Sequence, residues 1–479
     1  APLVRRWKQR LPAHVAAYFE EEIVVPASAA DSIWLARDLA GLVDEVETEG
    51  ADWSRLADLA GGELAGWWQV TLDFLQIVTK FWPDILAERQ RSDPAAHRNA
   101  LIRAEARRLA AHPPAGPIVA AGSTGSIPAT ADLLAVIASL PRGAVVLPGL
   151  DTALTPHNHA DLLDPGKNPH GHPQYGLARL LRLLGAGPAQ VVELALAAHP
   201  RTVLVNRALA LTDDTAQWSA RRLAPPALDE ALAGLSIIQA RNEDEEARAV
   251  ALSARAALER GKTVGIVSPD RNLARRIAAE LGRFGILVDD AAGAPLFQAP
   301  AGRLARLLLA LAAGGCSGLD LLALLRQRSV TFGLERGRLA ALADAIDLGL
   351  LRGQRPAPGL AGLRAALAAN VSGATPHPAR RLNEADAAAI SALFDVLETA
   401  MAPLGALVAA DRIDAAALAR ALGQSLLAAT GPETTLRGCD ELHAWAEQMG
   451  RLAGEGHRFP PVGLDGVLSA LMQGFQVRN

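Results

Sequence analysis

The apolar positions between residues 30 and 112 repeat at helical spacing. Leu35, Leu39 and Leu42 fall on one face of a predicted helix, and a second apolar stretch, rich in Trp, runs from Trp67 to Trp82. We therefore expect this whole segment to be helical. Its Trp side chains are more typical of a helical core than of a platform on which bases stack.

Beyond residue 112 the pattern changes to short apolar runs separated by turns. Residues 117–121 predict a buried strand, 130–140 a helix and 144–147 a second strand. A strand, a loop, a helix and a strand in this order are typical of a parallel βαβ unit. The loop between the first strand and the helix, residues 122–126, consists of Gly, Ser and Thr.

A loop rich in Pro, His and Gly follows from Pro148 to about Tyr175, and helices are expected after it. Thr202 to Val205 is apolar and β-branched, and is interpreted as a further short strand.

A second alternation of strands and helices begins near Leu235. Asn242 followed by Glu245 is typical of a capping box at the start of one helix, and Asp270 is the expected cap of the next. The strands expected around these two helices are residues 236–239, 263–267 and 286–288. From Gly302 to about Phe475 the pattern is helical again.

Length and composition narrow the class of protein. A chain of 479 residues is too long for one hydrophobic core, so two to four domains are expected. The net charge of −4 argues against a uniformly basic coat, and an excess of Arg over Lys is more typical of genomic composition than of nucleic-acid binding. Cys316 and Cys439 have no metal-like spacing, which favours a reducing cytoplasm.

No run of eighteen apolar residues and no signal peptide is found in the sequence, so neither a membrane span nor secretion is expected. The chain begins without Met and stops at Gln476–Asn479, just after a helical pattern. We therefore expect it to be a piece of a longer protein.

The loop of residues 122–126 is the main candidate for binding. Open α/β sheets bind ligands at the carboxyl ends of their strands, where loop amides point at the cleft. The loop lacks a Gly-Lys-Ser/Thr ending, so binding of a magnesium nucleotide is not expected. A contact of Ser123, Thr124 and Ser126 with nucleic-acid phosphate and an ordinary tight turn are both compatible with the pattern.

The other motifs give weaker evidence for a functional site. Gly261-Lys262-Thr263 resembles the end of a phosphate loop, but Ala256 stands where its first glycine belongs, and the order is helix to strand rather than strand to helix. No Ser/His/Asp triad pattern and no cluster of carboxylates with Lys appears. Two His-x-His pairs form a weak pattern for a zinc site: His157, His159, His170 and His172. A surface loop or a loop that contacts a substrate is the favoured interpretation of this segment.

The segment from Gly265 to Arg275, continuing to Phe284-Gly285-Ile286, resembles the opening of the second motor domain of superfamily-one DNA helicases. In that family a strand leads to a Tyr-Arg pair, a helix and a Gly-Ile-Pro. Pro269 stands at the position of the nucleotide-contacting Arg. The first α/β unit ends its strand in Ala120-Ala121-Gly122, where the family has an Asp-Glu pair that holds magnesium. The resemblance therefore implies a helicase fold without motor chemistry.

Three stretches are similar to the AddB family, the helicase-like and nuclease subunit of the bacterial AddAB helicase–nuclease that processes DNA double-strand breaks, in its alphaproteobacterial form. They are residues 120–130 with 145–151, His172–Gly176, and 237–308. The nuclease part of the family, with its iron–sulfur cluster and its magnesium, is not represented here. No cofactor is therefore expected in this segment.

The resemblance implies an α/β fold class: two degenerate parallel-sheet helicase-like domains of superfamily-one type, each with a helical insertion. The first domain would comprise residues 1–29 and 113–234, with the insertion 30–112. The second would comprise residues 235–316, followed by the insertion 317–479.

The resemblance also implies binding of single-stranded and end-containing DNA, reading of a recombination signal, and a partner subunit of AddA type. We expect Arg271 and Arg275, one helical turn apart at a helix start, to contact the strand together with the loop at Ser123–Ser126. Gln174, within the family-like stretch His172–Gly176, is the remaining expected DNA contact. No catalytic residue and no metal ligand is expected.

Two other interpretations remain. One is an active superfamily-one ATPase whose phosphate loop lies before Ala1. It is opposed by the missing carboxylates at Ala120 and Ala121 and by Pro269. The other is a helical scaffold that binds only protein, which would lack a salt-dependent affinity for single-stranded DNA.

Overall fold

The computed structural model of the chain forms two compact units, one of residues 1–38 and 250–479 and the other of residues 39–249. Each unit is described by itself. The structure describes residues 28–58, 65–194, 199–220, 222–352, 355–374, 381–431, 435–453 and 458–478.

The unit of residues 39–249 opens with helices. They are α3 (Ala29–Glu49, whose first residues belong to the other unit), η1 (Trp53–Asp58), α4 (Ala65–Gln76), the π-helical turn η3 (Ile77–Phe81), α5 (Trp82–Glu88) and α6 (Pro94–Ala111). The predicted helical character of residues 30–112 is thereby confirmed for the described residues. The buried Asn99 side chain on α6 donates to the carbonyl oxygens of Glu47 (2.7 Å) and Thr48 (3.2 Å). It thus adds a second donor to the Glu47 carbonyl, which also accepts the Gly50 N–H at 3.2 Å, and provides a donor for the Thr48 carbonyl at the end of α3.

The first predicted α/β unit is confirmed in its order of strand, helix and strand, but its first strand is not buried as predicted, since Val119 is 61% exposed. Strand β1 (Ile118–Ala121) pairs in parallel with β2 (Gly143–Val146), and α7 (Pro128–Ser139) connects them. Leu134 of α7 is buried with Leu180 of a later helix, and Ala120 and Val145 of the two strands pack against them. A helix that connects two parallel strands and packs against them in this way is the elementary parallel unit.

The remaining elements of this unit are short. They are α8 (Pro156–Asp161), η4 (Pro165–Lys167), η5 (Pro169–Gly171), α9 (Tyr175–Leu183), η6 (Pro188–Gln190), α10 (Pro200–Ala208), η7 (Thr212–Gln217) and α11 (Pro225–Leu232). The predicted strand Thr202–Val205 is wrong, because these residues lie inside α10. Pro200 occupies the first helical position and His199 accepts the N–H of Arg201 at 3.1 Å. These start contacts outweigh the weak β preference of two valines.

In the unit that contains residues 250–479, the two predicted helices form with their predicted caps. Helix α12 (Glu243–Glu259, whose first residues belong to the other unit) begins after Asn242, which accepts the N–H of Glu245 at 2.9 Å. Helix α13 (Arg271–Gly282) begins after Asp270, which accepts the N–H of Asn272 at 2.7 Å.

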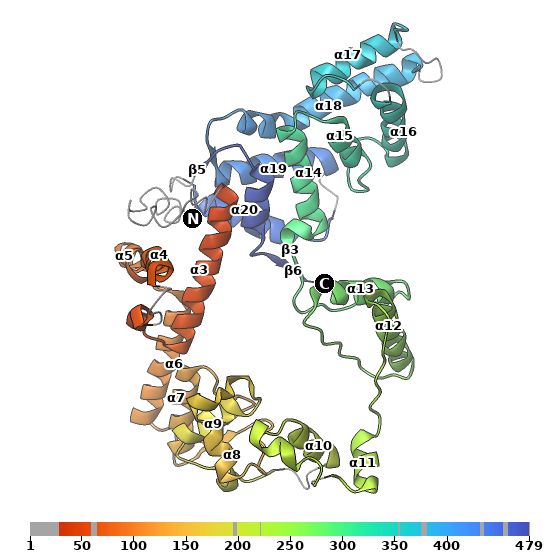
Figure 1. Cartoon of the computed structure of the whole chain (residues 1–479). Coiled ribbons are helices and arrows are strands. Elements are labelled where there is room, and N and C mark those ends of the chain that lie inside the picture. The colour runs from red at the N-terminus through yellow and green to blue at the C-terminus, as the bar shows by residue number, and fades with distance from the viewer. Residues whose placement is uncertain are drawn as a thin grey trace. The chain divides into compact units, whose positions relative to one another are not determined.

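The three strands expected around these helices are not found. Residues 236–239, 263–267 and 286–288 take part in no strand ladder within the described part of the chain, and Figure 1 draws plain coil on both sides of α13. Ile237 and Val267 are each 98% exposed and Leu287 is 96% exposed. An extended segment becomes a strand only when a second backbone accepts its hydrogen bonds. The described chain is therefore mostly helical with one parallel strand pair, and a second parallel sheet is not shown.

A helical block follows α13 and confirms, for the described residues and apart from one short strand pair, the helical pattern expected from Gly302 to Phe475. It is opened by β3 (Ala294–Pro295), which pairs antiparallel with β6 (Gln476–Val477). A second short pair joins β4 (Ile413–Asp414) to β5 (Arg458–Phe459). Its helices are η8 (Leu296–Gln298), α14 (Pro300–Ala313), α15 (Gly318–Leu325), α16 (Arg336–Ile346), the π-helical turn η9 (Asp347–Leu351), α17 (Gly359–Val371), α18 (Glu384–Val408), α19 (Ala415–Thr430), α20 (Cys439–Arg451) and α21 (Leu464–Met472).

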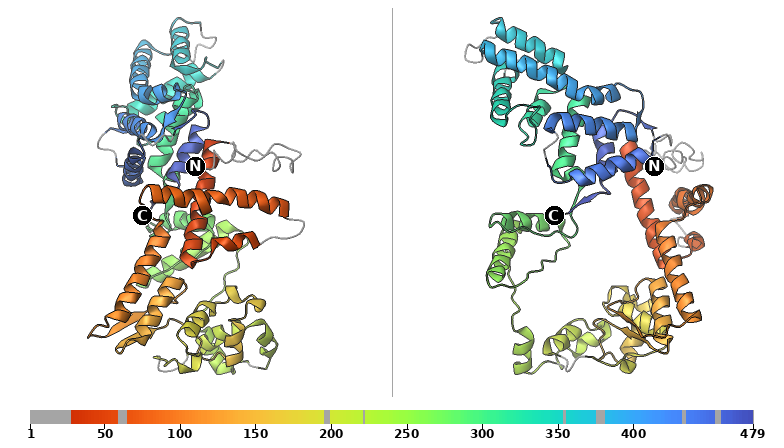
Figure 2. Two further views of the ribbon diagram at one scale, coloured as in Figure 1. Left: turned by 90° about the vertical axis from the view of Figure 1, so that its left-hand side faces the viewer. Right: turned by 180° about the vertical axis from the view of Figure 1, so that it is seen from behind.

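Helix α14 lies against α15, α18, α19 and α21. Figure 1 labels the first three of these near α14, and Figure 2 draws the same helical block from two further sides. Its Leu304, Leu308 and Leu311 are almost fully buried in the main core of the unit. Arg306 of α14 forms a bidentate ion pair with Asp465 of α21, with both N–O distances 2.8 Å. The core of this unit is thus built around α14.

Within the part of the chain that the structure describes, one helix, α18, is long and apolar enough to cross a membrane by length and composition. Its Ile390, Phe394 and Leu404 are buried in the core shared with α14 and α19. Core helices of globular domains pass the same test of length and composition, and the packing of α18 is of that kind.

Hydrogen exchange distinguishes paired from unpaired extended segments. We expect the amides of Val264, Gly265 and Ile266 to exchange much faster than those of Ile118 and Gly122, because the latter donate to carbonyl oxygens at 3.0 and 3.1 Å. Exchange followed by peptide mass spectrometry measures both segments in one sample. Equal protection of the two segments would contradict the unpaired state and would restore the predicted second sheet.

Candidate functional site

The candidate site lies at the carboxyl end of β1. The Gly122 N–H donates to the Val146 carbonyl at 3.1 Å and so continues the pairing of β1 with β2 for one more residue. The chain then turns: the Ser123 hydroxyl accepts the N–H of Gly125 at 3.2 Å. Gly125 has a φ of +61°, and a Cβ there would lie 3.0 Å from a methyl carbon of Leu180. Glycine is therefore the residue that this turn accepts without strain.

Three amides of this loop are free donors. Within the described residues, the N–H groups of Ser123, Thr124 and Ser126 donate to no acceptor. The Thr124 and Ser126 residues are exposed, and Ser123 is half-buried. Helix α7 starts directly after them, and its N-cap, Ile127, gives no side-chain cap. Free amides next to an uncapped helix N-terminus favour an anion, since both present positive charge to it.

We call residues 122–127 the amide loop. The buried Leu180 of α9 packs against this loop, and the loop continues directly from the β1–β2 pair. Its shape therefore depends on buried contacts. The structure brings the predicted residues Ser123, Thr124 and Ser126 together in this loop. The arrangement can bind an anion through backbone donors. Residues 122–127 include no carboxylate, imidazole or amine that could act as a general base or acid, or that could activate the Ser and Thr hydroxyls as nucleophiles.

The Gln174 side chain makes two hydrogen bonds within its own unit. Its Oε1 accepts the N–H of Asp151 at 3.1 Å, and its Nε2 donates to the carbonyl of Gly149 at 2.9 Å. It thereby fixes the loop that follows β2. The His172 ring supports this arrangement: its Nδ1 accepts the N–H of Gln174 at 3.1 Å, so its Nε2 carries the proton that is donated to the Leu209 carbonyl at 2.7 Å. Both ends of the Gln174 amide are thus in use within the fold.

Gln174, which clamps the loop after β2 through these two hydrogen bonds, also lines a cavity of about 490 Å³. Its lining includes Asp151 and Gln174, together with Asn206 of α10 and Trp218. The sequence did not reveal this cavity because its far wall is α10, which the apolar pattern predicted as a strand. Pro200 after His199 is the feature that could have identified the helix.

Arg271 is held inside its own unit. Its guanidinium binds Asp290 in a bidentate pair, with N–O distances of 3.1 and 2.7 Å, and also donates to the Gly293 carbonyl at 2.6 Å. The hydrogen bond from Arg271 lowers the pKa of Asp290 below its usual range. Gly293 has a φ of +66°, and a Cβ there would lie 2.6 Å from the Val477 carbonyl oxygen. Arg271 therefore links α13 to the start of the helical block.

Arg275 is less firmly held. It donates to Asn272 one turn back on α13 and to the Gln298 side chain at 3.5 Å. Both arginines do share one side of α13, as their spacing predicted. Arg271 and Arg275 belong to one unit and the amide loop to the other, so each group is described by itself.

The four histidines of the Pro148–Tyr175 region make contacts within the fold. His170 packs edge-on against Tyr175, with ring centroids 4.8 Å apart, and His157 lies 3.6 Å from Asp161. Burial lowers the pKa of His159, and the positive charge of Arg182 contributes to the same shift. Among the described residues, no group of three or more His, Cys, Asp or Glu side chains is arranged to hold a metal ion.

No protein-family model matches the chain, and no curated protein matches it.

The clamp role of Gln174 can be tested by mutation. We expect Gln174→Ala to lower the free energy of unfolding by about 1–2 kcal/mol, because two hydrogen bonds to the loop after β2 are lost. Denaturant unfolding measures this change. Thr124→Ala, at an exposed position, is the control and should stay within about 0.5 kcal/mol of the unaltered chain. Full stability of the Gln174 variant would mean that its amide is available to a ligand instead.

Proposed function

We propose that this chain is the helicase-like, catalytically silent part of a subunit of a DNA double-strand-break repair helicase–nuclease of AddB type, and that it binds single-stranded DNA. The observation that carries the proposal is the amide loop: three free backbone donors beside an uncapped helix N-terminus, at the carboxyl end of a parallel strand.

The chemistry of the loop suits a phosphodiester. Backbone amides provide several donors that carry no charge of their own and require no side-chain ordering. Contacts of this kind position a nucleic-acid strand without reading its bases. Recognition of a recombination signal would need side chains elsewhere that reach base edges.

The absence of motor chemistry is supported by the end of β1. The strand runs through Ala120 and Ala121 into Gly122, and neither alanine supplies a carboxylate that could hold magnesium or orient water. At the start of α13, Pro269 precedes the capping Asp270 and supplies no cation for a nucleotide phosphate. A DNA strand that is bound by a protein without an ATP cycle can be retained rather than translocated. The AddA-type partner subunit would then supply the motor.

A charge placed in the loop tests the proposal. We expect Thr124→Asp to weaken binding of a fluorescently labelled single-stranded oligonucleotide by about tenfold or more, because the added carboxylate repels phosphate where the free amides attract it. Fluorescence anisotropy at a fixed, moderate salt concentration measures the affinity.

Ser139→Asp is the matched control, since it adds the same charge at the exposed far end of α7. Its oligonucleotide affinity should remain close to that of the unaltered chain. Equal affinities of the two variants would remove the amide loop from the DNA path. Absence of any binding by the unaltered chain would favour the protein-binding scaffold.

A further inference from the structure

A second cavity lies in the helical block. It is a cavity of about 810 Å³ between the start of α15, the π-helical turn η9 and the segment that leads into α17. The Gly-rich stretch Gly314–Gly318 forms one side. Three arginines and one carboxylate also line it: Arg326, Arg352, Arg355 and Asp347.

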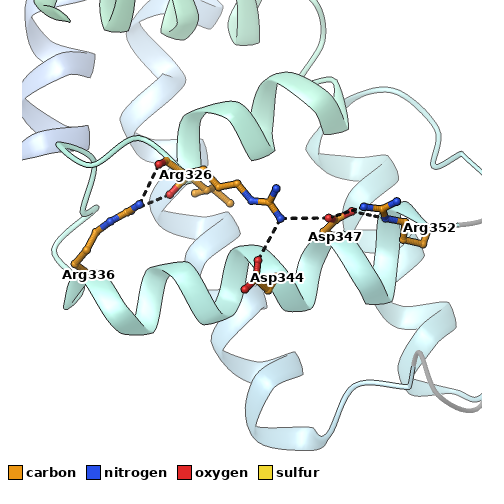
Figure 3. Close-up of polar contacts among 6 residues, drawn as sticks. Arg326, Arg336, Asp344, Asp347 and Arg352 are labelled. Carbon is orange, nitrogen blue, oxygen red and sulfur yellow. Dashed lines mark hydrogen bonds and ion pairs between the residues drawn. The ribbon is translucent and has the colours of Figure 1, made fainter. Parts of the chain in front are cut away.

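Asp347 organises two of these arginines. It accepts two hydrogen bonds from Arg352, at 2.9 and 3.1 Å, and one from Arg326 at 3.2 Å. Figure 3 shows its carboxylate between the two guanidinium groups, and the same Arg326 nitrogen that donates to Asp347 also donates to Asp344 at 3.2 Å. Its side chain is only 11% exposed, whereas those of Arg326 and Arg352 are 53% and 61% exposed. The buried carboxylate thus holds two cationic groups at the surface of the cavity.

Arg336 provides hydrogen-bond donors for the carbonyl oxygens at the end of α15. Its guanidinium donates to the carbonyl oxygens of Leu325 and Arg326, each at 3.0 Å, at the end of α15. The final carbonyls of a helix carry partial negative charge and would otherwise attract a neighbouring guanidinium. With these carbonyls satisfied by Arg336, the side chain of Arg326 is directed to Asp344 and Asp347 at the cavity (Figure 3).

The cavity lining carries more positive than negative charge. Three arginines line the cavity with one carboxylate, Asp347, and a second carboxylate outside the lining, Asp344, pairs with Arg326. Arg355 is exposed, and within the described residues its guanidinium has no acceptor. The thiol of Cys316, also in the lining, adds no negative charge near neutral pH, because burial raises its pKa to about 11. An ion-pair network that served only to join α15 to η9 would not require the additional cation at Arg355.

We propose that this cavity binds a phosphate-bearing anion. Planar guanidinium groups bind phosphate oxygens in pairs, and Arg is the preferred side chain for such recognition. Arg355 and Arg326 would contact the phosphate, and Asp347 would act as a positioning residue that keeps Arg326 and Arg352 oriented. The phosphate belongs either to a small anion or to the backbone of a nucleic acid. This site does not depend on the amide loop and would stand if the proposed function failed.

Pyrophosphate is a suitable probe for the full chain. We expect it to bind saturably in isothermal titration calorimetry, and to raise the melting temperature above that in sodium chloride of the same ionic strength. Arg355→Ala should weaken binding by about tenfold or more, since charge-assisted hydrogen bonds are lost while no ion pair of the described fold is broken. Arg355→Lys keeps the charge and loses the planar guanidinium. Its affinity for pyrophosphate should lie between those of the unaltered chain and of Arg355→Ala.

Arg338→Ala is the matched control, because Arg338 is a half-exposed arginine of α16 whose partner is Asp386, outside the cavity. It should bind pyrophosphate as the unaltered chain does. Failure of pyrophosphate to bind, or equal losses in the Arg355 and Arg338 variants, would overturn the proposal.

A second arm with a single-stranded oligonucleotide identifies the source of the phosphate. A loss in Arg355→Ala for both ligands assigns the cavity to nucleic acid, and a loss for pyrophosphate alone assigns it to a small anion. Thr124→Asp should leave the difference between the Arg355 and Arg338 variants intact, which separates this site from the amide loop.

Discussion

The parallel pairing of β1 with β2 is the interaction on which the candidate site depends. Because the two strands run the same way, their carboxyl ends meet at one edge, and the loops that leave them are held side by side. The Gly122 hydrogen bond extends this pairing into the amide loop, and Gln174 fixes the loop after β2. A site made of backbone amides has no specific side chains, so its function rests on the geometry that this pairing imposes.

In the other unit, ion pairs rather than strand pairing position the polar groups. The ion pair of Arg271 with Asp290 joins α13 to the segment before the helical block. The β3–β6 pair joins the first and last residues of that block. Asp347 orders the arginines of the cavity beside α15. These pairs are partly exposed, so each adds little stability, and their main effect is to fix the direction of a guanidinium group.

The sequence predicted the elements that depend on local contacts. The βαβ unit follows from apolar periodicity, and α12 and α13 follow from the caps at Asn242 and Asp270. The strand predicted at Thr202–Val205 failed because Pro200 and His199 start a helix there. The expected strand at 263–267 has strand-like residues, but pairing is decided by a distant backbone, which periodicity cannot reveal. The arginine cavity was missed because its members come together only in the fold and Arg is common throughout the chain.

The central claim is that this chain holds single-stranded DNA through phosphate contacts. The most direct test is the affinity of the unaltered chain for a labelled single-stranded oligonucleotide, measured by anisotropy across a series of salt concentrations. The account predicts saturable binding whose logarithm falls linearly with the logarithm of the salt concentration, as release of counterions from phosphates requires. Affinity that is absent at low salt, or that does not change with salt, would contradict it.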